Sequence, residues 1–185
     1  MEWIQNLINL TKRKYVKTMF KKIQKTIYVW IKQYRWKEVI PLLNKKNKKL
    51  LDVGCQDLSL YKRLKKDFEV TLVDFSPKHP DVKKENVQKL SFADTSFDTV
   101  LCFQVLEHTT DPVKAIKELR RVTKTDLFIS VPNEPFFTLF RFMIWEKEHL
   151  WAITPKALKH YLGKPVVEKK IFFGRYYLAK WTFKN

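Results

Sequence analysis

This chain of 185 residues has very little glycine and cysteine, and it lacks a long uninterrupted apolar run. Its two cysteines, Cys55 and Cys102, fit no metal-ligand spacing and cannot build a disulfide scaffold, so we expect two reduced thiols. The most apolar stretch, 135–145, is too short to span a bilayer and contains Arg141. The N-terminus lacks the compact apolar core and small-residue cleavage site of a signal peptide. We therefore expect a cytoplasmic protein, either in solution or peripheral at a membrane.

Acidic residues are nearly absent from the first quarter of the chain. Residues 1–49 contain 14 Lys and Arg but only Glu2 and Glu38, so they carry +12 of the net charge of +18. Apolar residues recur there at helical spacing, and we expect helices from residue 1 to about 43. Three interpretations stay open: these basic amphipathic helices cap a cofactor cleft, lie on anionic lipid, or bind RNA phosphates. The predicted domains are 1–47, packed on the core, and 48–185.

Beyond residue 49, strand and helix patterns alternate. The expected strands are 50–53, 70–74, a short one at 82–87, 99–103, 127–131, 166–173 and 176–183. The expected helices are 59–66, 111–122, 136–145 and 154–162, the second and fourth opening on Asp-Pro and Thr-Pro caps. This alternation predicts an α/β fold, a doubly wound Rossmann-like and mainly parallel sheet. The C-terminal hairpin around Gly174 adds an antiparallel strand, and the N-terminal helices complete the fold.

The first predicted strand leads into an unusual turn, L-L-D-V-G-C-Q-D at 50–57. A strand that stops at a tight glycine turn before a helix leaves backbone N–H groups open to a ligand. The next strand ends in Asp74, and an acid at that place can bind both hydroxyls of a ribose. Together these features predict a cofactor that contains adenosine.

Four motifs then carry a resemblance to a known family. They are L-L-D-V-G-C at 50–55, V-T-L-V-D-F-S at 70–76, N-V-Q-K-L-S-F-A-D-T-S-F-D at 86–98, and Q-V-L-E-H at 104–108 followed by I-S-V-P-N at 129–133. In this order and spacing they resemble the class I S-adenosylmethionine-dependent methyltransferases, in the type 11 family similar to ubiquinone and menaquinone biosynthesis enzymes. The resemblance implies S-adenosyl-L-methionine as cofactor, no metal, and a methyl acceptor that is a small molecule or linked to a lipid.

The resemblance also implies roles for particular residues. The first loop would seat the methionine end, Asp74 and Phe75 would lie at the ribose, Asn86 and Val87 at the adenine edge, and Gln104 and Val105 beside the methionine. Catalytic candidates are two histidines near the mouth of the site, either of which could act as a general base. The first-loop residues are Asp52, Val53, Gly54, Cys55 and Gln56, and the histidines are His108, which follows Glu107, and His149.

The sequence departs from the family pattern at several positions. Gln56 and Leu58 stand where the family commonly has glycine, and Asn86 stands where it has an acid. The segment between Asp74 and Asn86 is short, which predicts that the second crossover helix is lost. Two alternatives to the methyltransferase therefore remain: an RNA methyltransferase or RNA-binding protein that uses the basic helices, and a degenerate, non-catalytic Rossmann-like scaffold.

Two further segments receive structural or alternative interpretations. We expect Asp98 to be structural, accepting hydrogen bonds from loop N–H groups at the start of its strand. The segment 136–151 is rich in large apolar residues. It can form an apolar acceptor pocket, a lid that faces a membrane, or a helix packed on the protein core.

Overall fold

The computed structural model describes residues 18, 19, 22, 26, 29–55, 58–133 and 150–184. The chain divides into two compact units, Met1–Leu43 and Asn44–Asn185. In the first unit, residues 29–39 are α-helical and run into the short 3-10 helix η1, Ile40–Leu42, which contains Pro41. That the N-terminal helices pack on the larger unit stays a prediction. No helix among the described residues is long and apolar enough to cross a bilayer.

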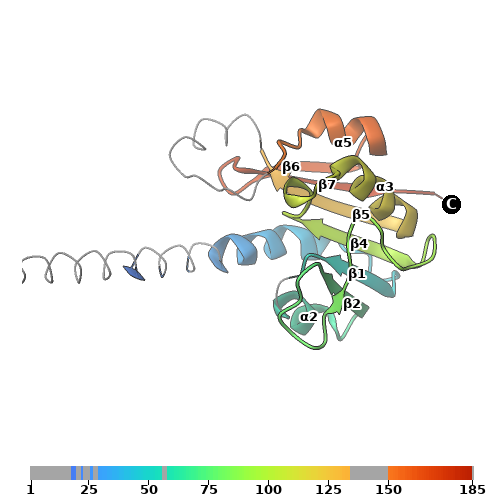
Figure 1. Cartoon of the computed structure of the whole chain (residues 1–185), viewed down its shortest axis with the longest axis horizontal. Coiled ribbons are helices and arrows are strands. Elements are labelled where there is room, and N and C mark those ends of the chain that lie inside the picture. The colour runs from blue at the N-terminus through green and yellow to red at the C-terminus, as the bar shows by residue number, and fades with distance from the viewer. Residues whose placement is uncertain are drawn as a thin grey trace, which may run out of the picture. The chain divides into compact units, whose positions relative to one another are not determined.

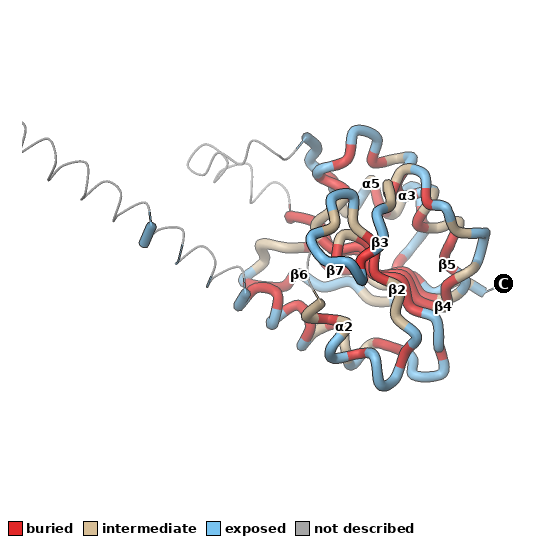
Figure 2. Tube along the Cα trace, turned by 60° about the horizontal axis from the view of Figure 1, so that its bottom comes forward, coloured by how far each residue is buried: buried red, intermediate tan, exposed pale blue. Residues whose placement is uncertain are grey.

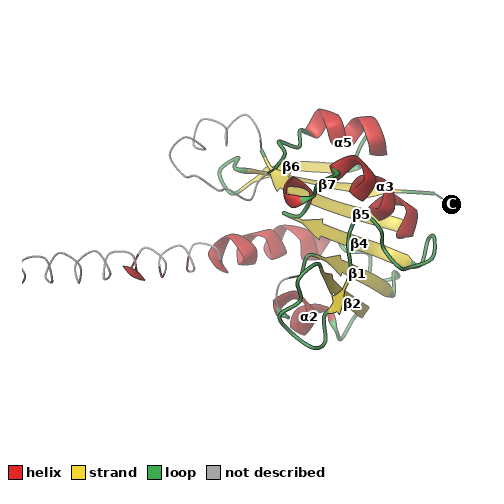
Figure 3. Ribbon diagram, in the orientation of Figure 1, coloured by secondary structure: helices red, strands yellow, loops and turns green. Residues whose placement is uncertain are grey.

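The second unit is built on one sheet of seven strands, shown in Figures 1 and 3. Its order is β3-β2-β1-β4-β5-β7-β6, and all neighbours are parallel except the pairs that involve β7. The strands are β1 (Lys49–Val53), β2 (Glu69–Asp74), β3 (Lys83–Lys84), β4 (Phe97–Phe103), β5 (Thr123–Pro132), β6 (Val167–Ile171) and β7 (Tyr176–Thr182). The helices are α2 (Ser59–Leu64), η2 (Leu106–His108), α3 (Pro112–Val122) and α5 (Pro155–Leu162). The predicted doubly wound, mainly parallel sheet with an antiparallel strand from the C-terminal hairpin is therefore confirmed.

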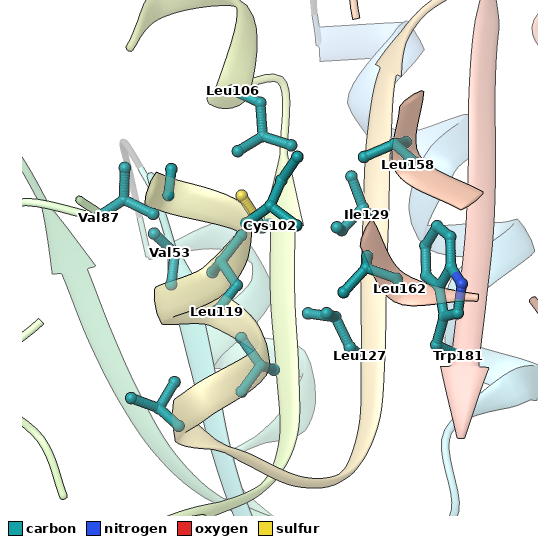
Figure 4. Close-up of a cluster of buried hydrophobic side chains, with 14 of the residues drawn as sticks. Val53, Val87, Cys102, Leu106, Leu119, Leu127, Ile129, Leu158, Leu162 and Trp181 are labelled. Atoms are coloured by element: carbon teal, nitrogen blue, oxygen red, sulfur yellow. The ribbon is translucent and has the colours of Figure 1, made fainter. Parts of the chain in front are cut away.

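Alternate side chains of each strand enter different layers. One face of the sheet packs against α3 and α5, whose buried residues recur every three or four positions. Figure 4 shows this core, in which Leu119 of α3 and Leu158 of α5 lie among strand side chains such as Ile129 and Trp181. A smaller cluster on the other face joins Leu72 of β2 to residues around α2. Figure 2 shows that burial is concentrated along the central strands, as expected for strands that are covered on both faces.

The element boundaries differ from the sequence prediction in a few places. Helix α2 ends at Leu64 rather than Lys66, while β4 and β5 begin earlier, at Phe97 and Thr123. The expected strand at 82–87 is reduced to β3, and η2 was not predicted. Residues 75–82 contain no helix, so the predicted loss of the second crossover helix is confirmed. The helix expected at 136–145 lies outside the described residues.

Several short polar interactions fix the ends of these elements. Asp111 and Thr154 cap α3 and α5 as predicted, since their side chains accept hydrogen bonds from Lys114 N and Ala157 N at 2.9 and 3.1 Å. Asp98 Oδ2 accepts from the backbone N–H groups of Lys48 and Lys49 at 2.9 and 3.0 Å, which confirms its structural role. Asp98 thereby ties the start of β1 to the start of β4.

Candidate functional site

The carboxyl ends of β1, β2, β4 and β5 meet at one edge of the sheet, which we call the site edge. From the central pair β1 and β4, the chain crosses in opposite directions: through α2 to β2, and through α3 to β5. Ligands of open α/β sheets bind where the strand order reverses in this way, outside the carboxyl ends of the strands. The loops after β1 and β4 lie at that point, so the fold itself places the candidate site between them.

Gly54 is the first residue beyond β1, and the structure requires glycine there. Its φ is +75°, a left-handed conformation that side chains disfavour. A Cβ at this position would overlap Val105 Cγ2, which follows β4. The backbone N–H groups of Gly54 and Cys55 both donate to Val73 O, at 2.8 and 3.3 Å, so the turn is fastened to β2. The loops after β1 and β4 are therefore in close contact at Gly54, where the Val105 side chain fills the space that a Cβ would take. The N–H groups of Gly54 and Cys55 already donate to β2, so the expectation that this turn leaves its N–H groups open to a ligand is wrong for these two residues.

Asp74 closes β2 beside this turn. Its Oδ1 accepts a hydrogen bond of 2.8 Å from Ser76 N, and its carbonyl accepts from Glu85 N at 3.0 Å. The carboxylate thus has a fixed direction at the site edge, next in the sheet to β1. The neighbouring Phe75 is exposed, so its ring contributes no buried wall to the site in this structure.

Asn86 and Val87 follow β3 and have different environments. Val87 lies in the main core, whereas Asn86 is half-buried and its Oδ1 accepts from Gln88 N at 2.9 Å and Gln88 Nε2 at 3.4 Å. Asn86 therefore shapes its own turn through the oxygen that could have accepted from an adenine amino group. Gln88 Oε1 in turn accepts from Thr110 Oγ1 and Asp111 N, at 2.9 and 2.7 Å. This glutamine joins the loop after β3 to the segment that leads into α3.

The loop after β4 begins with a strained residue. Gln104 has a φ of +57°, which is uncommon for a residue other than glycine. Its N–H donates to Ser130 O at 2.9 Å and its Nε2 to Ser130 Oγ at 3.2 Å, so β5 holds it in this conformation. Val105 then turns the chain into η2, where His108 N donates to Val105 O at 3.0 Å and the His108 side chain is exposed. That His108 acts as a general base stays a prediction.

Two acidic residues and a thiol are buried behind these loops. Asp52, Cys102 and Glu107 are all buried, and the first two lie on the adjacent strands β1 and β4. Burial raises the pKa of the Cys102 thiol well above its usual range, and the charges of Glu107 and Asp52 raise it further. The side chain of Val53 likewise lies in the core, and that of Cys55 is buried with Leu72 on the α2 side. Asp52, Val53 and Cys55 therefore support the first loop from beneath.

A clamp centred on Arg121 holds the loop that precedes β4. Its guanidinium donates to the carbonyls of Phe92 and Leu90 at 2.8 and 3.1 Å, and to the carboxylates of Asp94 and Glu118 at 2.7 to 2.8 Å. The hydrogen bond from Arg121 is the main cause that lowers the pKa of Glu118. We did not anticipate this residue from the sequence. The spacing of Glu118 and Arg121 suggests a helical ion pair, but their contact with residues 90–94 appears only in the folded chain.

The carbonyl of Glu107 fastens a distant part of the chain to the site edge. It accepts hydrogen bonds from Leu150 N and Trp151 N, at 2.8 and 3.3 Å. The structure therefore brings Gly54, Asp74 and Val105 to one edge, together with the loop after β3 and the segment at 150–151. Gln56 and His149 lie outside the described residues, and their proposed roles stay predictions.

The chain matches a known family and several known proteins. The family is described as a methyltransferase domain, and the match covers residues 51–129. An uncharacterised protein of Methanocaldococcus jannaschii is 40% identical over 100 residues, which is 49% of this chain and 44% of that protein. A tRNA U34 carboxymethyltransferase of Nautilia profundicola is 26% identical over 172 residues, covering 80% of this chain and 57% of that protein. A ubiquinone biosynthesis O-methyltransferase of Coxiella burnetii is 27% identical over 148 residues, covering 71% and 63%.

The chain thus spans between 44% and 63% of the length of these relatives. Among solved structures, an S-adenosylmethionine-dependent methyltransferase from Archaeoglobus fulgidus superposes with a TM-score of 0.64 at 17% identity. That likeness covers 85% of this chain and 99% of the other, and at such low identity it shows the shared fold alone.

Proposed function

Because residues 51–129 match a methyltransferase domain, we propose that this chain works as a class I S-adenosylmethionine-dependent methyltransferase of type 11. It would transfer a methyl group to a small-molecule or lipid-linked acceptor at the site edge. S-adenosyl-L-methionine is the cofactor of that family. One observation carries the proposal: the tight turn at Gly54, packed against Val105, lies beside the oriented carboxylate of Asp74, at the point where the strand order reverses. We infer a cytoplasmic location, which the two buried free thiols support.

The residues present fit the cofactor. Glycine at position 54 lets the loops after β1 and β4 pack together, because Val105 takes the space that a Cβ would need. Asp74 would accept hydrogen bonds from the ribose hydroxyls, and its bond from Ser76 N holds the carboxylate in one direction. Asn86 and Val87 would flank the adenine through their backbone and surface, since Asn86 Oδ1 already accepts within its turn. Gln104 and Val105 would lie beside the methionine end.

When bound, the cofactor supplies a methyl group on a positively charged sulfur, from which an acceptor oxygen, nitrogen or carbon can take it. The protein would hold the two reactants in line and exclude water from between them. For a hydroxyl acceptor, the His108 imidazole would take the proton that the acceptor loses. His149 is the second candidate for this role.

The experiment that tests the proposal is a calorimetric titration with S-adenosylmethionine and, separately, S-adenosylhomocysteine. We expect saturable binding at one site, weakened in Asp74→Ala by about 1–3 kcal/mol through the lost hydrogen bonds to a charged group. Asp81→Ala removes an exposed acid from the same loop and serves as the matched control. If neither ligand binds the unmodified chain, the chain is the non-catalytic scaffold. Equal affinities in the two variants would contradict the placement of the ribose at Asp74.

RNA is the second candidate acceptor. The +12 charge of residues 1–49 favours it, and one relative at 26% identity is a tRNA U34 carboxymethyltransferase. Binding to RNA through phosphates falls steeply with salt, because neutralised phosphates release counterions. A filter-binding titration with bulk tRNA over a range of salt concentrations tests this candidate, and no binding at low salt would exclude it.

A further inference from the structure

Exposed apolar side chains are concentrated at the site edge. In the described part of 44–184, the large apolar residues that the structure exposes are Phe75, Leu150, Trp151, Tyr161, Val166 and Phe173. Phe75 follows β2, Leu150 and Trp151 are bonded to Glu107 after β4, and Phe173 lies in the turn between β6 and β7. Tyr161 and Val166 lie at the opposite end of the sheet, near the end of α5 and the start of β6. Four of these six exposed residues therefore lie at the site edge.

The turn between β6 and β7 reaches the same edge as the cofactor loops. Pro132, at the end of β5, pairs with Tyr176, and the next residue, Asn133, donates from N to Arg175 O at 2.9 Å and from Nδ2 to Gly174 O at 2.7 Å. In Figure 1 this turn lies on the side of the sheet to which the arrowheads of β4 and β5 point. The turn is thus fixed by hydrogen bonds from Asn133, directly after β5.

This turn presents a phenylalanine to solvent at a conformational cost. Phe172 and Phe173 have φ values of +52° and +55°, which are outliers for bulky residues. Each such residue costs on the order of 1–3 kcal/mol. Phe172 is buried, whereas Phe173 is 86% exposed and meets the Phe172 ring edge-on at 5.7 Å between centroids, so little packing offsets its strain. Strain of this kind that persists in a fixed turn points to a role outside the fold.

The surroundings of Phe173 are cationic. The chain carries Lys169, Lys170 and Arg175 around this turn, and residues 169–176 contain no acid. Lys169 and Lys170, on the edge strand that leads into the turn, are exposed. An exposed aromatic tip flanked by lysines matches the chemistry of an anionic bilayer surface, where the ring enters the acyl boundary and the lysines meet the headgroups.

We infer that the site edge docks on an anionic lipid bilayer, with Phe173 inserted and Lys169 and Lys170 at the headgroups. Phe75, Leu150 and Trp151 lie at the same edge and add apolar contact with the bilayer. Docking in this orientation turns the methyl-transfer site toward the membrane. The identity of the acceptor rests on the proposed function: if the chain transfers a methyl group, the acceptor is a lipid-linked molecule that is methylated at the bilayer surface.

The test is co-sedimentation of the full chain with vesicles of phosphatidylcholine alone and of an equimolar mixture with phosphatidylglycerol. We expect binding to the anionic vesicles, reduced about tenfold or more in Phe173→Asn, since most of a buried phenyl group's transfer free energy is lost. Asn tolerates the left-handed conformation, so the variant should fold and unfold at an equal or higher temperature. The matched control is Val166→Asn, which removes a 59% exposed apolar side chain from the far end of the same hairpin.

The comparison of these two variants separates the tip from the basic segment at 1–49, because both variants keep the charge of the protein. Equal binding by Phe173→Asn and the unmodified chain would overturn the inference, as would an equal loss in Val166→Asn. A dimer in sedimentation velocity that Phe173→Asn dissociates, with vesicle binding unchanged, would also overturn it and assign the tip to a second copy of the chain. Titration of the unmodified chain and the two variants with S-adenosylmethionine tests the proposed function separately. If none of the three binds the cofactor while vesicle binding is intact, the proposed function is contradicted and the docking inference is not.

Discussion

The substitution Gly54→Ala tests the geometry of the first loop most directly. The added Cβ meets two separate obstacles, the left-handed φ of +75° and the overlap with Val105 Cγ2. The conformation costs about 1–2 kcal/mol for a residue with a Cβ. Forcing a methyl group into an occupied space adds typically 1–3 kcal/mol. We therefore expect Gly54→Ala to lower the free energy of unfolding by about 2–5 kcal/mol.

Gly163→Ala is the matched control, because it isolates the first of these obstacles. Gly163 has nearly the same φ, +78°, but nothing lies within 4 Å of the position that its Cβ would take. Gly163→Ala should therefore lower the free energy of unfolding only by the conformational cost, about 1–2 kcal/mol. The difference between the two variants measures the overlap with Val105, and Val105→Ala in the Gly54→Ala background should recover most of it.

The assay is urea denaturation followed by circular dichroism, with the slope of the transition compared between variants so that only a change in midpoint is read as stability. For a chain of this size, each kcal/mol corresponds to roughly 2–4 °C in melting temperature, which gives an independent check. Equal losses in Gly54→Ala and Gly163→Ala, or no recovery in the double variant, would refute the contact between the loops after β1 and β4. We also expect the cofactor affinity of Gly54→Ala to fall, because the added Cβ displaces Val105, which is proposed to lie beside the methionine end.

Three further results follow from the contacts of single residues. Arg121→Met should destabilise the protein by about 1–3 kcal/mol through the lost charged hydrogen bonds, and hydrogen exchange should rise at residues 90–94; unchanged exchange there would contradict the clamp. Arg121 lowers the pKa of Glu118 in the folded protein, so the stability that this pair contributes is present above the ordinary pKa of 4.5 and is lost as the pH falls through the lower pKa of the folded state. The urea midpoint should therefore decline less between pH 6 and pH 3 in Arg121→Met than in the unmodified chain, and an equal decline would contradict the pair. Because burial raises the pKa of Cys102, its thiol should resist iodoacetamide at pH 8 until the protein unfolds, and rapid labelling by mass spectrometry would contradict its burial.

Repeating patterns made much of the fold predictable. The apolar strands, the Asp-Pro and Thr-Pro helix starts and the hairpin around Gly174 are local signals, and each gives the expected element in the structure. Strand ends were less predictable, since β5 continues directly from α3 and begins at Thr123, where no local pattern marks a boundary. The placement of Gly54 and Asp74 at the same end of the sheet was also predictable, because each lies at the carboxyl end of an apolar strand and the two strands are parallel neighbours.

Contacts between loops could not be predicted in the same way. Gln88 joins the loop after β3 to Asp111, and Arg121 holds residues 90–94, although neither residue belongs to a motif. For Asn86, the sequence suggested an amide oxygen that is available to adenine, while the structure shows it accepting from Gln88. Such interactions depend on side-chain directions that are fixed only when distant segments pack together, so a single sequence carries no periodic signal for them.

Backbone strain gives a last argument about where this protein works. Among the described residues, those with positive φ are Gly54, Thr95, Gln104, Gly163, Phe172, Phe173 and Gly174. Thr95 and Gly163 lie at the far end of the sheet, before β4 and β6, and the others lie at the site edge. Glycine makes such a conformation cheap, but Gln104, Phe172 and Phe173 do not. Ser130 of β5 bonds Gln104, the hydrogen bond from Arg175 N to Phe172 O closes the turn that contains the two phenylalanines, and Asn133 bonds that turn at Gly174 and Arg175. Strand β5 and the residue that follows it therefore bond both the turn at Gln104 and the turn that presents Phe173, so the two proposed surfaces share one support.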